Sequence, residues 1–339
     1  MTPSRTRRGY LAASLGLAAM LAFAAPAAAQ TRIILSNDNS GLGLKGKTFE
    51  VLKKELETRL GSKVQVELHH SGTLFNQKTQ LQGVQLGSAN LIAPGQGVFA
   101  SLAPNVNVLS IPFLLSTPAA IDGALKDPKV SGTFEPELER KNVKIVAVWM
   151  NGPRDISTRS PKPVLLPTDM KGLKIRVQPA PVDIKTMQVL GANVVTIDWT
   201  EVSTAMQQGV IDAVEPTPNA LVGAGLPDLI GETSKVGYRF DFYLVATGKK
   251  WWDSLPADVR AGFQEALKVA TAWNWENTDK ENAEAYQQLE KAGKKVYSLT
   301  PEQRAQWVAA VQPVWKEFGD NVVGPEVMAR LKEIDAKAQ

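Results

Sequence analysis

Residues 172–218 constrain the fold more than any other part of the chain, because short apolar runs alternate there with helix-compatible segments. Each apolar run has the length of a strand, and each segment between two runs is long enough for a crossover helix. Strands joined in this way lie parallel in one sheet, so the stretch predicts an α/β fold. The expected strands are 174–177, 194–197 and 210–214, and the expected helices are 182–190 and a second segment that ends before Gly209.

Cap and turn residues mark the ends of these segments. Gly191 follows the first helix and Gly209 the second, and glycine accommodates the left-handed backbone with which many helices end. Asp198 and Glu201 are three residues apart and form the pattern of a capping box before the second helix. These local signals support the boundaries that the apolar pattern predicts.

Arg176 stands near the end of the first of these strands. Ligands of open α/β sheets bind at the carboxyl ends of the strands. A guanidinium group is permanently charged and can hold a carboxylate by two parallel hydrogen bonds. We therefore predict an anion site at Arg176, with a surface arginine or a structural ion pair as the alternative.

Three motifs in this stretch resemble the DctP-type solute-binding proteins of tripartite ATP-independent periplasmic (TRAP) transporters. They are GLKIRV at 172–177, LGANVV at 190–195 and the WTEV…QQGVID pattern at 199–212. The resemblance extends over essentially the whole chain after its N-terminal segment. It implies that Arg176 binds the carboxylate of a small organic acid, which the protein delivers to the membrane subunits of a TRAP transporter.

The resemblance also implies a two-domain periplasmic binding protein of the type II, Venus-flytrap class, with hinge strands between the domains. A segment at 256–293 is helix-compatible almost throughout and would be the long helix that bridges both domains. We expect domain I to comprise 30–152 and about 242–280. We expect domain II to comprise about 153–241 and 281–339.

The N-terminus has the pattern of a signal peptide over residues 1–29. Arg5, Arg7 and Arg8 precede an apolar, alanine-rich run at 11–25, and three alanines at 27–29 suit signal peptidase. The segment 6–11 also resembles a twin-arginine signal, so export by the Sec or the Tat route is open. We expect a periplasmic protein that begins near Gln30, and no later run is long enough to span a membrane.

Charge and composition narrow the classes of function. The chain of 339 residues has a pI of about 9.0, but without the three signal arginines only 35 basic residues face 34 acidic ones. The charge therefore gives no argument for nucleic-acid binding. The chain has no cysteine, which excludes disulfides, a thiol nucleophile and zinc–thiolate sites. We expect no cofactor, no metal and a monomer.

Other candidate ligand contacts follow from the resemblance. Arg154 ends a W-x-x-G-x-R pattern and would be a second group for a carboxylate or hydroxyl, with a hinge ion pair as the alternative. Trp199 would pack against the apolar part of the ligand. The remaining polar candidates are Gln178, Thr217, Glu215, Asn37, Asn39 and Gln96. Pro216 stands where the family usually has an asparagine, which predicts a ligand with fewer polar groups.

Two other functions are considered beside this one. Residues 41–48 match a phosphate-loop pattern between a strand and a helix, so a nucleotide binder is one alternative. Export and the lack of a better magnesium ligand than Asp198, a predicted helix cap, speak against it. An exported α/β enzyme acting on a small carboxylate is the other, although the sequence has no G-x-S-x-G elbow and only the adjacent histidines His69 and His70. We therefore expect a binding protein and not an enzyme.

Overall fold

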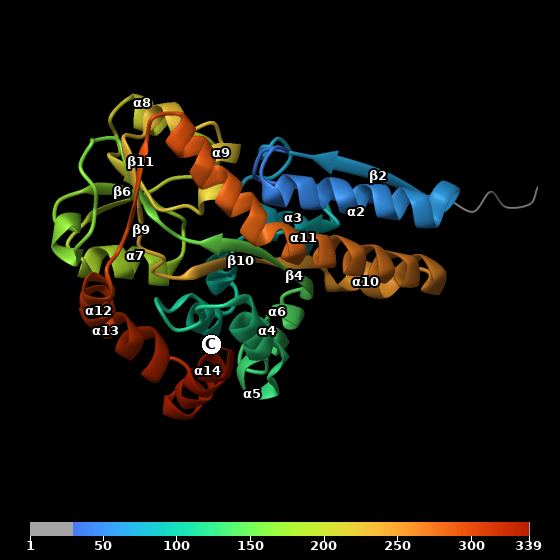
Figure 1. The fold of residues 1–339 in the computed structure, drawn as a ribbon. Helices are drawn as coiled ribbons and strands as arrows, with labels where there is room; N and C mark the ends of the chain where they lie inside the picture. The colour runs from blue at the N-terminus through green and yellow to red at the C-terminus, as the bar shows by residue number, and fades with distance from the viewer. Residues whose placement is uncertain (1–29, 339) are drawn as a thin grey trace, which may run out of the picture.

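The computed structural model describes residues 30–338, and the predicted signal peptide lies outside them. The chain forms two sheets (Figure 1), each with helices around it. We call lobe I the part built on the sheet β2-β1-β3-β10-β4, and lobe II the part built on the sheet β11-β9-β5-β8-β6-β7. The α/β class and the two-lobed binding-protein architecture that the sequence predicted are confirmed.

Lobe I begins with a parallel pair of strands and the helix that connects them. β1 (Thr31–Ser36) pairs with β2 (Val64–His69), and α2 (Leu44–Leu60) crosses between them. Phe49, Leu52 and Leu56 lie on one face of α2 and are fully buried. This spacing of three and four residues is that of a helix with one apolar face. The remaining elements before the next long strand are β3 (Leu91–Ile92), α3 (Gln80–Gln85), α4 (Pro118–Lys126), α5 (Pro128–Ser131) and α6 (Glu135–Arg140).

Two long antiparallel strands complete this sheet and lead to the other lobe. β4 (Val143–Pro153) pairs with β10 (Phe240–Gly248) along almost its whole length. Residues 143–149 are almost all apolar, a composition typical of a strand buried on both sides. β4 is instead the edge strand of the sheet, and residues 144–148 are only partly buried. Beyond Pro153 the chain passes directly into the second sheet at β5 (Ile156–Thr158).

Lobe II contains the predicted parallel unit. β6 (Lys174–Val177) lies between β7 (Asn193–Thr196) and β8 (Ala213–Val214) and pairs with both in parallel. The crossover helices are α7 (Pro181–Val189) and α8 (Val202–Gln207). The predicted capping box is present at Trp199–Glu201, where the Asp198 carboxylate accepts from the Thr200 amide and the Glu201 carboxylate accepts from the Asp198 amide.

Two further strands and a short helix belong to lobe II, and a second short helix lies in lobe I. β9 (Glu232–Lys235) pairs with β5 and with β11 (Lys295–Ser298). α9 (Pro218–Gly223) follows β8, and its side chains pack against the long helix. α10 (Lys249–Ser254) follows β10 and belongs to lobe I.

One helix connects the two lobes over their common side. α11 (Ala257–Lys291) has 35 residues and runs obliquely across the molecule in Figure 1. It packs against α2 and β4 in lobe I and against β11 in lobe II. The bridging helix that the sequence predicted is therefore a single continuous element.

The C-terminal helices cross back between the lobes. α12 (Pro301–Ala310) and α13 (Gln312–Trp315) follow β11, and α14 (Pro325–Ala338) packs against α4 and α5 of lobe I. We had grouped all of 281–339 with domain II. The packing of α14 instead leads us to propose that 325–338 belongs with lobe I, while the other domain boundaries stay as predicted.

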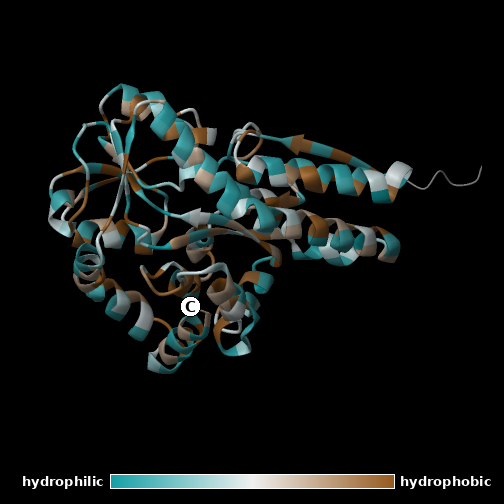
Figure 2. Cartoon of the chain, in the orientation of Figure 1, coloured by the Kyte–Doolittle hydropathy of each residue, from teal (hydrophilic) through white to brown (hydrophobic). Residues whose placement is uncertain are grey.

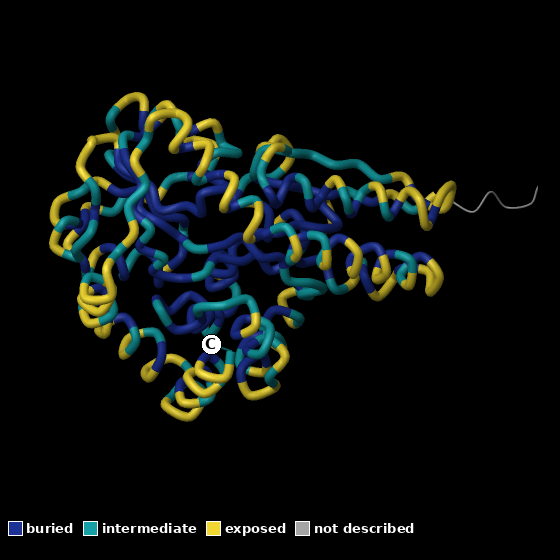
Figure 3. Tube along the Cα trace, in the orientation of Figure 1, coloured by how far each residue is buried: buried dark blue, intermediate teal, exposed yellow. Residues whose placement is uncertain are grey.

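The distribution of hydropathy agrees with this arrangement. Figure 2 shows hydrophobic residues concentrated in the central strands, and Figure 3 shows the same strands buried and the outer helix faces exposed. Within residues 30–338 no helix combines the length and the apolar character that a membrane span requires.

Candidate functional site

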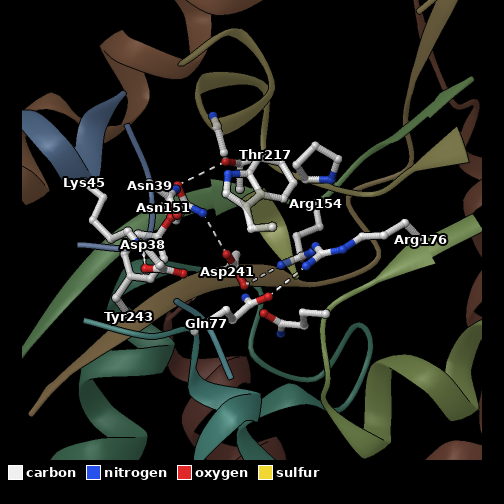
Figure 4. Close-up of a pocket in the computed structure, with 15 residues that line it drawn as sticks. Asp38, Asn39, Lys45, Gln77, Asn151, Arg154, Arg176, Thr217, Asp241 and Tyr243 are labelled. Carbon is white, nitrogen blue, oxygen red and sulfur yellow. Dashed lines mark hydrogen bonds and ion pairs between the residues drawn. The ribbon is translucent and has the colours of Figure 1, made fainter. Parts of the chain in front are cut away.

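A cavity of about 30 Å³ lies where the strand ends of the two lobes face each other. It opens beside β6 and α9 on the lobe II side and beside the loops after β1 and β3 on the lobe I side (Figure 4). Six of the nine residues that the sequence predicted for the site line it. They are Arg176, Arg154, Trp199, Gln178, Thr217 and Asn39.

Arg176 is the cation of this cavity that has no acidic partner. The side chain extends from β6 and is only 2% exposed. Its Nε and Nη2 donate to the Ile197 carbonyl at 3.1 and 2.9 Å, and Nη2 also donates to Gln77 Oε1 at 2.8 Å. Among residues 30–338 no carboxylate forms an ion pair with this guanidinium, and its Nη1 makes no hydrogen bond. Two N–H groups therefore remain free to bind an anion.

Burial destabilises the charge on this side chain. Removal from water lowers the pKa of Arg176 to about 10, well below its ordinary value, although Glu215 and two aspartates raise it in part. The guanidinium also lies 5.2 Å from the centre of the Trp199 ring, within the range of a cation–π contact. A buried arginine without a counterion is costly to the fold, and an anionic ligand would remove that cost.

Arg154 lies at the crossing between β4 and β5, and its charge is already balanced. Its Nε and Nη2 donate to the two carboxylate oxygens of Glu215 at 2.5 Å each, and Nη1 donates to Asp241 at 3.2 Å. Tyr238 donates a further hydrogen bond to Glu215. Burial acts against the charge of Arg154, but the two carboxylates raise its pKa well above the ordinary value. The guanidinium thus forms the hinge ion pair that was the alternative interpretation, and its role as a second ligand contact stays a prediction.

Three predicted residues do not line the cavity because other groups bind them behind its wall. Glu215 is held by Arg154. Asn37 is bonded to His70 Nδ1 at 2.8 Å and to the Asn39 amide at 3.0 Å. When the Gln96 amide is placed so that both of its ends find partners, its nitrogen donates to the Phe242 carbonyl and its oxygen accepts from Arg239. In this structure the three residues support the wall, and their roles as ligand contacts stay predictions.

Five polar wall residues were not predicted. On the lobe I side Lys45 Nζ lies 2.6 Å from Asp38 Oδ1 and 4.2 Å from the centre of the Tyr243 ring. The residues missed are Lys45, Gln77, Asn151, Asp241 and Tyr243. Asp38 also lines the wall, and its position directly after the first predicted strand, with Asn37 and Asn39, predicts a polar group of the cleft. Lys45 stands at the start of the following helix, which is the one signal that the sequence offered for it. The other four depend on contacts between distant segments.

Buried amides connect the cavity wall to the bridging helix. Asn151 Nδ2 donates to Asp241 at 2.7 Å, and Thr217 donates to Asn151 Oδ1 at 3.1 Å. From α11, Asn282 Nδ2 donates to the Asn151 carbonyl at 2.8 Å. Gly152 permits this approach, because it has a φ of 125° and an added Cβ would lie 2.3 Å from the Asn282 amide nitrogen. The end of β4, the wall and α11 are therefore one hydrogen-bonded unit.

The phosphate-loop pattern does not form an open loop. Helix α2 already begins at Leu44, so Gly46, Lys47 and Thr48 lie in its first turns. Lys47 Nζ bonds both carboxylate oxygens of Glu281 on α11, at 2.6 and 2.7 Å. A lysine that serves a nucleotide would point toward bound phosphates, so this geometry speaks against the nucleotide alternative. Within the described residues no cluster of three histidine or acidic side chains could hold a metal ion.

Comparison with known proteins finds matches over most of the chain. The family model described as bacterial extracellular solute-binding protein, family 7 (DctP), matches residues 36–321. A C4-dicarboxylate-binding periplasmic protein DctP from Vibrio cholerae is 31% identical over 287 residues, which are 85% of this chain and 86% of that protein.

Solved structures match the fold over a similar extent. A TRAP periplasmic solute-binding protein from Shewanella oneidensis, solved with bound succinate, superposes with a TM-score of 0.85 at 25% identity and covers 91% of this chain and all of its own. A sugar acid binding protein from Advenella mimigardefordensis, solved with galactonate, also reaches 0.85 at 22% identity, over 91% of this chain and 99% of its own.

Proposed function

This chain belongs to the bacterial extracellular solute-binding proteins of family 7, and on that premise we propose that it captures a small organic acid between its lobes. The acid's carboxylate binds to Arg176, and the loaded protein delivers it to the membrane subunits of a TRAP-type transporter. The relatives support the class of ligand, since the Vibrio protein is described as binding C4-dicarboxylates and the Shewanella structure holds succinate.

The observation that carries the proposal is the unpaired charge of Arg176. Of the four buried cations around the cavity, Lys45, Arg154 and Arg239 each have a carboxylate within 3.2 Å, and Arg176 has none. Buried charges in folded proteins are paired, so an isolated one indicates a missing counterion. A carboxylate oxygen placed against Nη1 would accept a charge-assisted hydrogen bond, and the guanidinium would keep its bonds to the Ile197 carbonyl and Gln77.

Entry of the acid requires the lobes to separate. The cavity of about 30 Å³ has room for only about two water molecules. Gln77 of lobe I and Arg176 of lobe II are hydrogen-bonded across it, so the lobes lie close together. Two short segments, 154–155 and 236–239, join the two sheets and would form the hinge. The ligand would then close the cleft by replacing water around Arg176 with the acceptor oxygens of its carboxylate.

Location and partners complete the proposal. Proteins of this family are periplasmic, and we propose that residues 1–29 direct export by the Sec or Tat route. We propose a monomer without cofactor, because a receptor that delivers one ligand to a membrane transporter needs neither. We also propose that the chain is not an enzyme, since Asp38 and Lys45 at the cavity are ion-paired with each other and have no separate base beside them.

Calorimetric titration of ligand-stripped protein tests the proposal. The first step is a thermal-shift panel of monocarboxylates, dicarboxylates, sugar acids and ATP with magnesium, which identifies the acid that stabilises the protein most. Arg176→Ala should then weaken binding of that acid by about 2–5 kcal/mol, because it removes one partner of a buried charge pair. Arg176→Lys should restore the charge but not the planar group that also bonds Ile197 and Gln77, and it should bind with intermediate strength.

Lys47→Ala is the matched control. It removes a lysine that lies on α2 and is paired with Glu281, outside the cavity. Its affinity for the acid should stay within about 0.5 kcal/mol of the wild type, as for a surface substitution away from the site. Stabilisation by ATP with magnesium alone, or full affinity in Arg176→Ala, would refute the proposal.

A further inference from the structure

The charges around the cavity discriminate between classes of organic acid, an inference that rests on the proposed function. Buried in and behind the wall are four cations and five carboxylates, so the formal charge of this cluster is −1 before a ligand binds. The cations are Lys45, Arg154, Arg176 and Arg239, and the carboxylates are Asp38, Asp183, Asp198, Glu215 and Asp241. A monocarboxylate adds one negative charge to this cluster, and a dicarboxylate adds two.

Only one end of the cavity has an unbalanced positive charge. In Figure 4 Arg176 lies at one side, whereas Asp38 and Lys45 lie at the opposite side with Asp241 between them. Lys45 cannot act as a second unpaired cation, because its Nζ is 2.6 Å from Asp38 and also donates to the Ala93 carbonyl at 3.2 Å. The positive charge that faces the cavity is therefore concentrated on Arg176.

In the middle of the wall the buried arginines and carboxylates are paired with each other. Arg154 is bonded through three of its nitrogens to Glu215 and Asp241. Asp241 accepts from Arg154, from Arg239 and from Asn151. Although burial acts to raise it, these arginines hold the pKa of Asp241 below its ordinary value. Asp241 thus stays negatively charged and faces the space that the far end of a ligand would occupy.

A second carboxylate at that end would meet two carboxylates and no free cation. Like charges at close range in a buried site repel each other strongly. Hydroxyl groups suit the same wall, because each can donate to Asp38 or Asp241 and accept from the amides of Asn39 or Asn151. Such a wall is a repulsive element of the kind that specific binding sites use against wrong ligands.

We infer that the ligand of this chain is a monocarboxylate whose other polar groups are hydroxyls, and that Asp38 and Asp241 exclude acids with a second carboxylate. Arg176 binds the carboxylate and the opposite wall binds the hydroxyls. This differs from the expectation drawn from Pro216, because the structure supplies polar partners at the far end from residues that the sequence motif does not include. It also separates this chain from relatives described as dicarboxylate-binding proteins.

The test compares pairs of acids that differ only at the far end. Gluconate is paired with glucarate, and 4-hydroxybutyrate with succinate, each titrated by calorimetry into ligand-stripped protein. The hydroxy monocarboxylate of the better-binding pair should be at least about tenfold tighter than its dicarboxylate partner. A third probe, 4-aminobutyrate, places an ammonium group where the hydroxyl would lie, and tighter binding of this probe than of 4-hydroxybutyrate would overturn the hydroxyl assignment.

Removal of the wall charges should reverse the preference. Asp38→Asn frees the charge of Lys45, and Asp241→Asn leaves Arg154 and Arg239 with Glu215 and Asp183 as partners. Each variant should shift the mono-to-dicarboxylate affinity ratio by about tenfold toward the dicarboxylate. The exposed Asp228→Asn changes the net charge equally and should leave the ratio unchanged.

The outcomes separate this inference from the function on which it rests. A dicarboxylate that binds wild type as tightly as its hydroxy partner, or a ratio that neither variant moves, overturns the inference while the carboxylate site stands. If no acid in the set binds, the proposed function itself fails.

Discussion

Replacement of Arg176 by methionine should leave the ligand-free protein as stable as the wild type or more stable. Burial lowers the pKa of this group to about 10, which corresponds to a penalty of roughly 3 kcal/mol for keeping the charge inside the protein. Methionine removes that penalty and fills similar space. It also removes the hydrogen bonds that the charged group donates to the Ile197 carbonyl and to Gln77, worth about 1.5 kcal/mol each. The two effects are of similar size, so the expected net change is about zero.

Arg154→Met is the matched comparison. It strips a guanidinium of the same size and depth from the same cavity wall, but this one is paired with Glu215 and Asp241. Removal of one partner of a buried ion pair costs about 3–5 kcal/mol, because the other charge is left without compensation. The stabilities of the two variants thus distinguish an arginine whose charge serves ligand binding from one whose charge stabilises the fold.

Urea unfolding of ligand-stripped protein, followed by tryptophan fluorescence, measures both effects. The midpoint for Arg176→Met should equal or exceed that of the wild type, and the midpoint for Arg154→Met should be clearly lower. Saturating ligand should raise the wild-type midpoint and leave that of Arg176→Met where it was. If the two variants lose similar stability without ligand, Arg176 is a structural residue and the reasoning fails.

Two further predictions concern the hinge and the closing surface. Burial raises the pKa of Asp155 from an ordinary 3.8 to about 7, although Tyr286 and Gly237 donate hydrogen bonds to the carboxylate. The stability that this group contributes is therefore fully present below about pH 4. As the pH rises through 7, roughly 4 kcal/mol of it should be lost. Asp155→Asn should flatten this slope in urea unfolding from pH 4.5 to 8, and an unchanged slope would assign it to other groups. A Cβ on Gly223 of lobe II would lie 2.9 Å from Gly43 Cα of lobe I. Gly223→Ala should therefore weaken ligand binding by about 1–3 kcal/mol, while thermal unfolding of the free protein stays the same. Wild-type affinity in this variant would show that the lobes do not meet there on closure.

The parts of the fold that could be predicted from the sequence are those whose structure depends on residues close together in the chain. The parallel order of β6, β7 and β8 follows from strand and helix lengths together with the cap residues Asp198 and Gly191, and all of these act within a few residues of chain. The position of β4 at the edge of its sheet could not be predicted from its apolar composition. Its outer side is covered in part by side chains from α11, such as Trp275, which donates to the Val148 carbonyl at 2.9 Å.

In the site, too, local signals were predictable and contacts between distant residues were not. Arg176 was identifiable because a strand end and a family motif coincide at one residue. The pairing of Arg154 with Glu215 joins residues 61 positions apart, and the contact of Gln77 with Arg176 joins residues 99 apart. Single-sequence patterns carry no information on such distances, so the balance of charges that separates Arg176 from the other cations became visible only in the folded chain.

A crystal structure of the protein with the most tightly bound acid tests the central claim most directly. We expect the ligand carboxylate within about 3.2 Å of Arg176 Nη1, with Arg154 still bonded to Glu215 and Lys45 still bonded to Asp38. A carboxylate held by Arg154 or Lys45, with Arg176 still bonded only to Ile197 and Gln77, would contradict it.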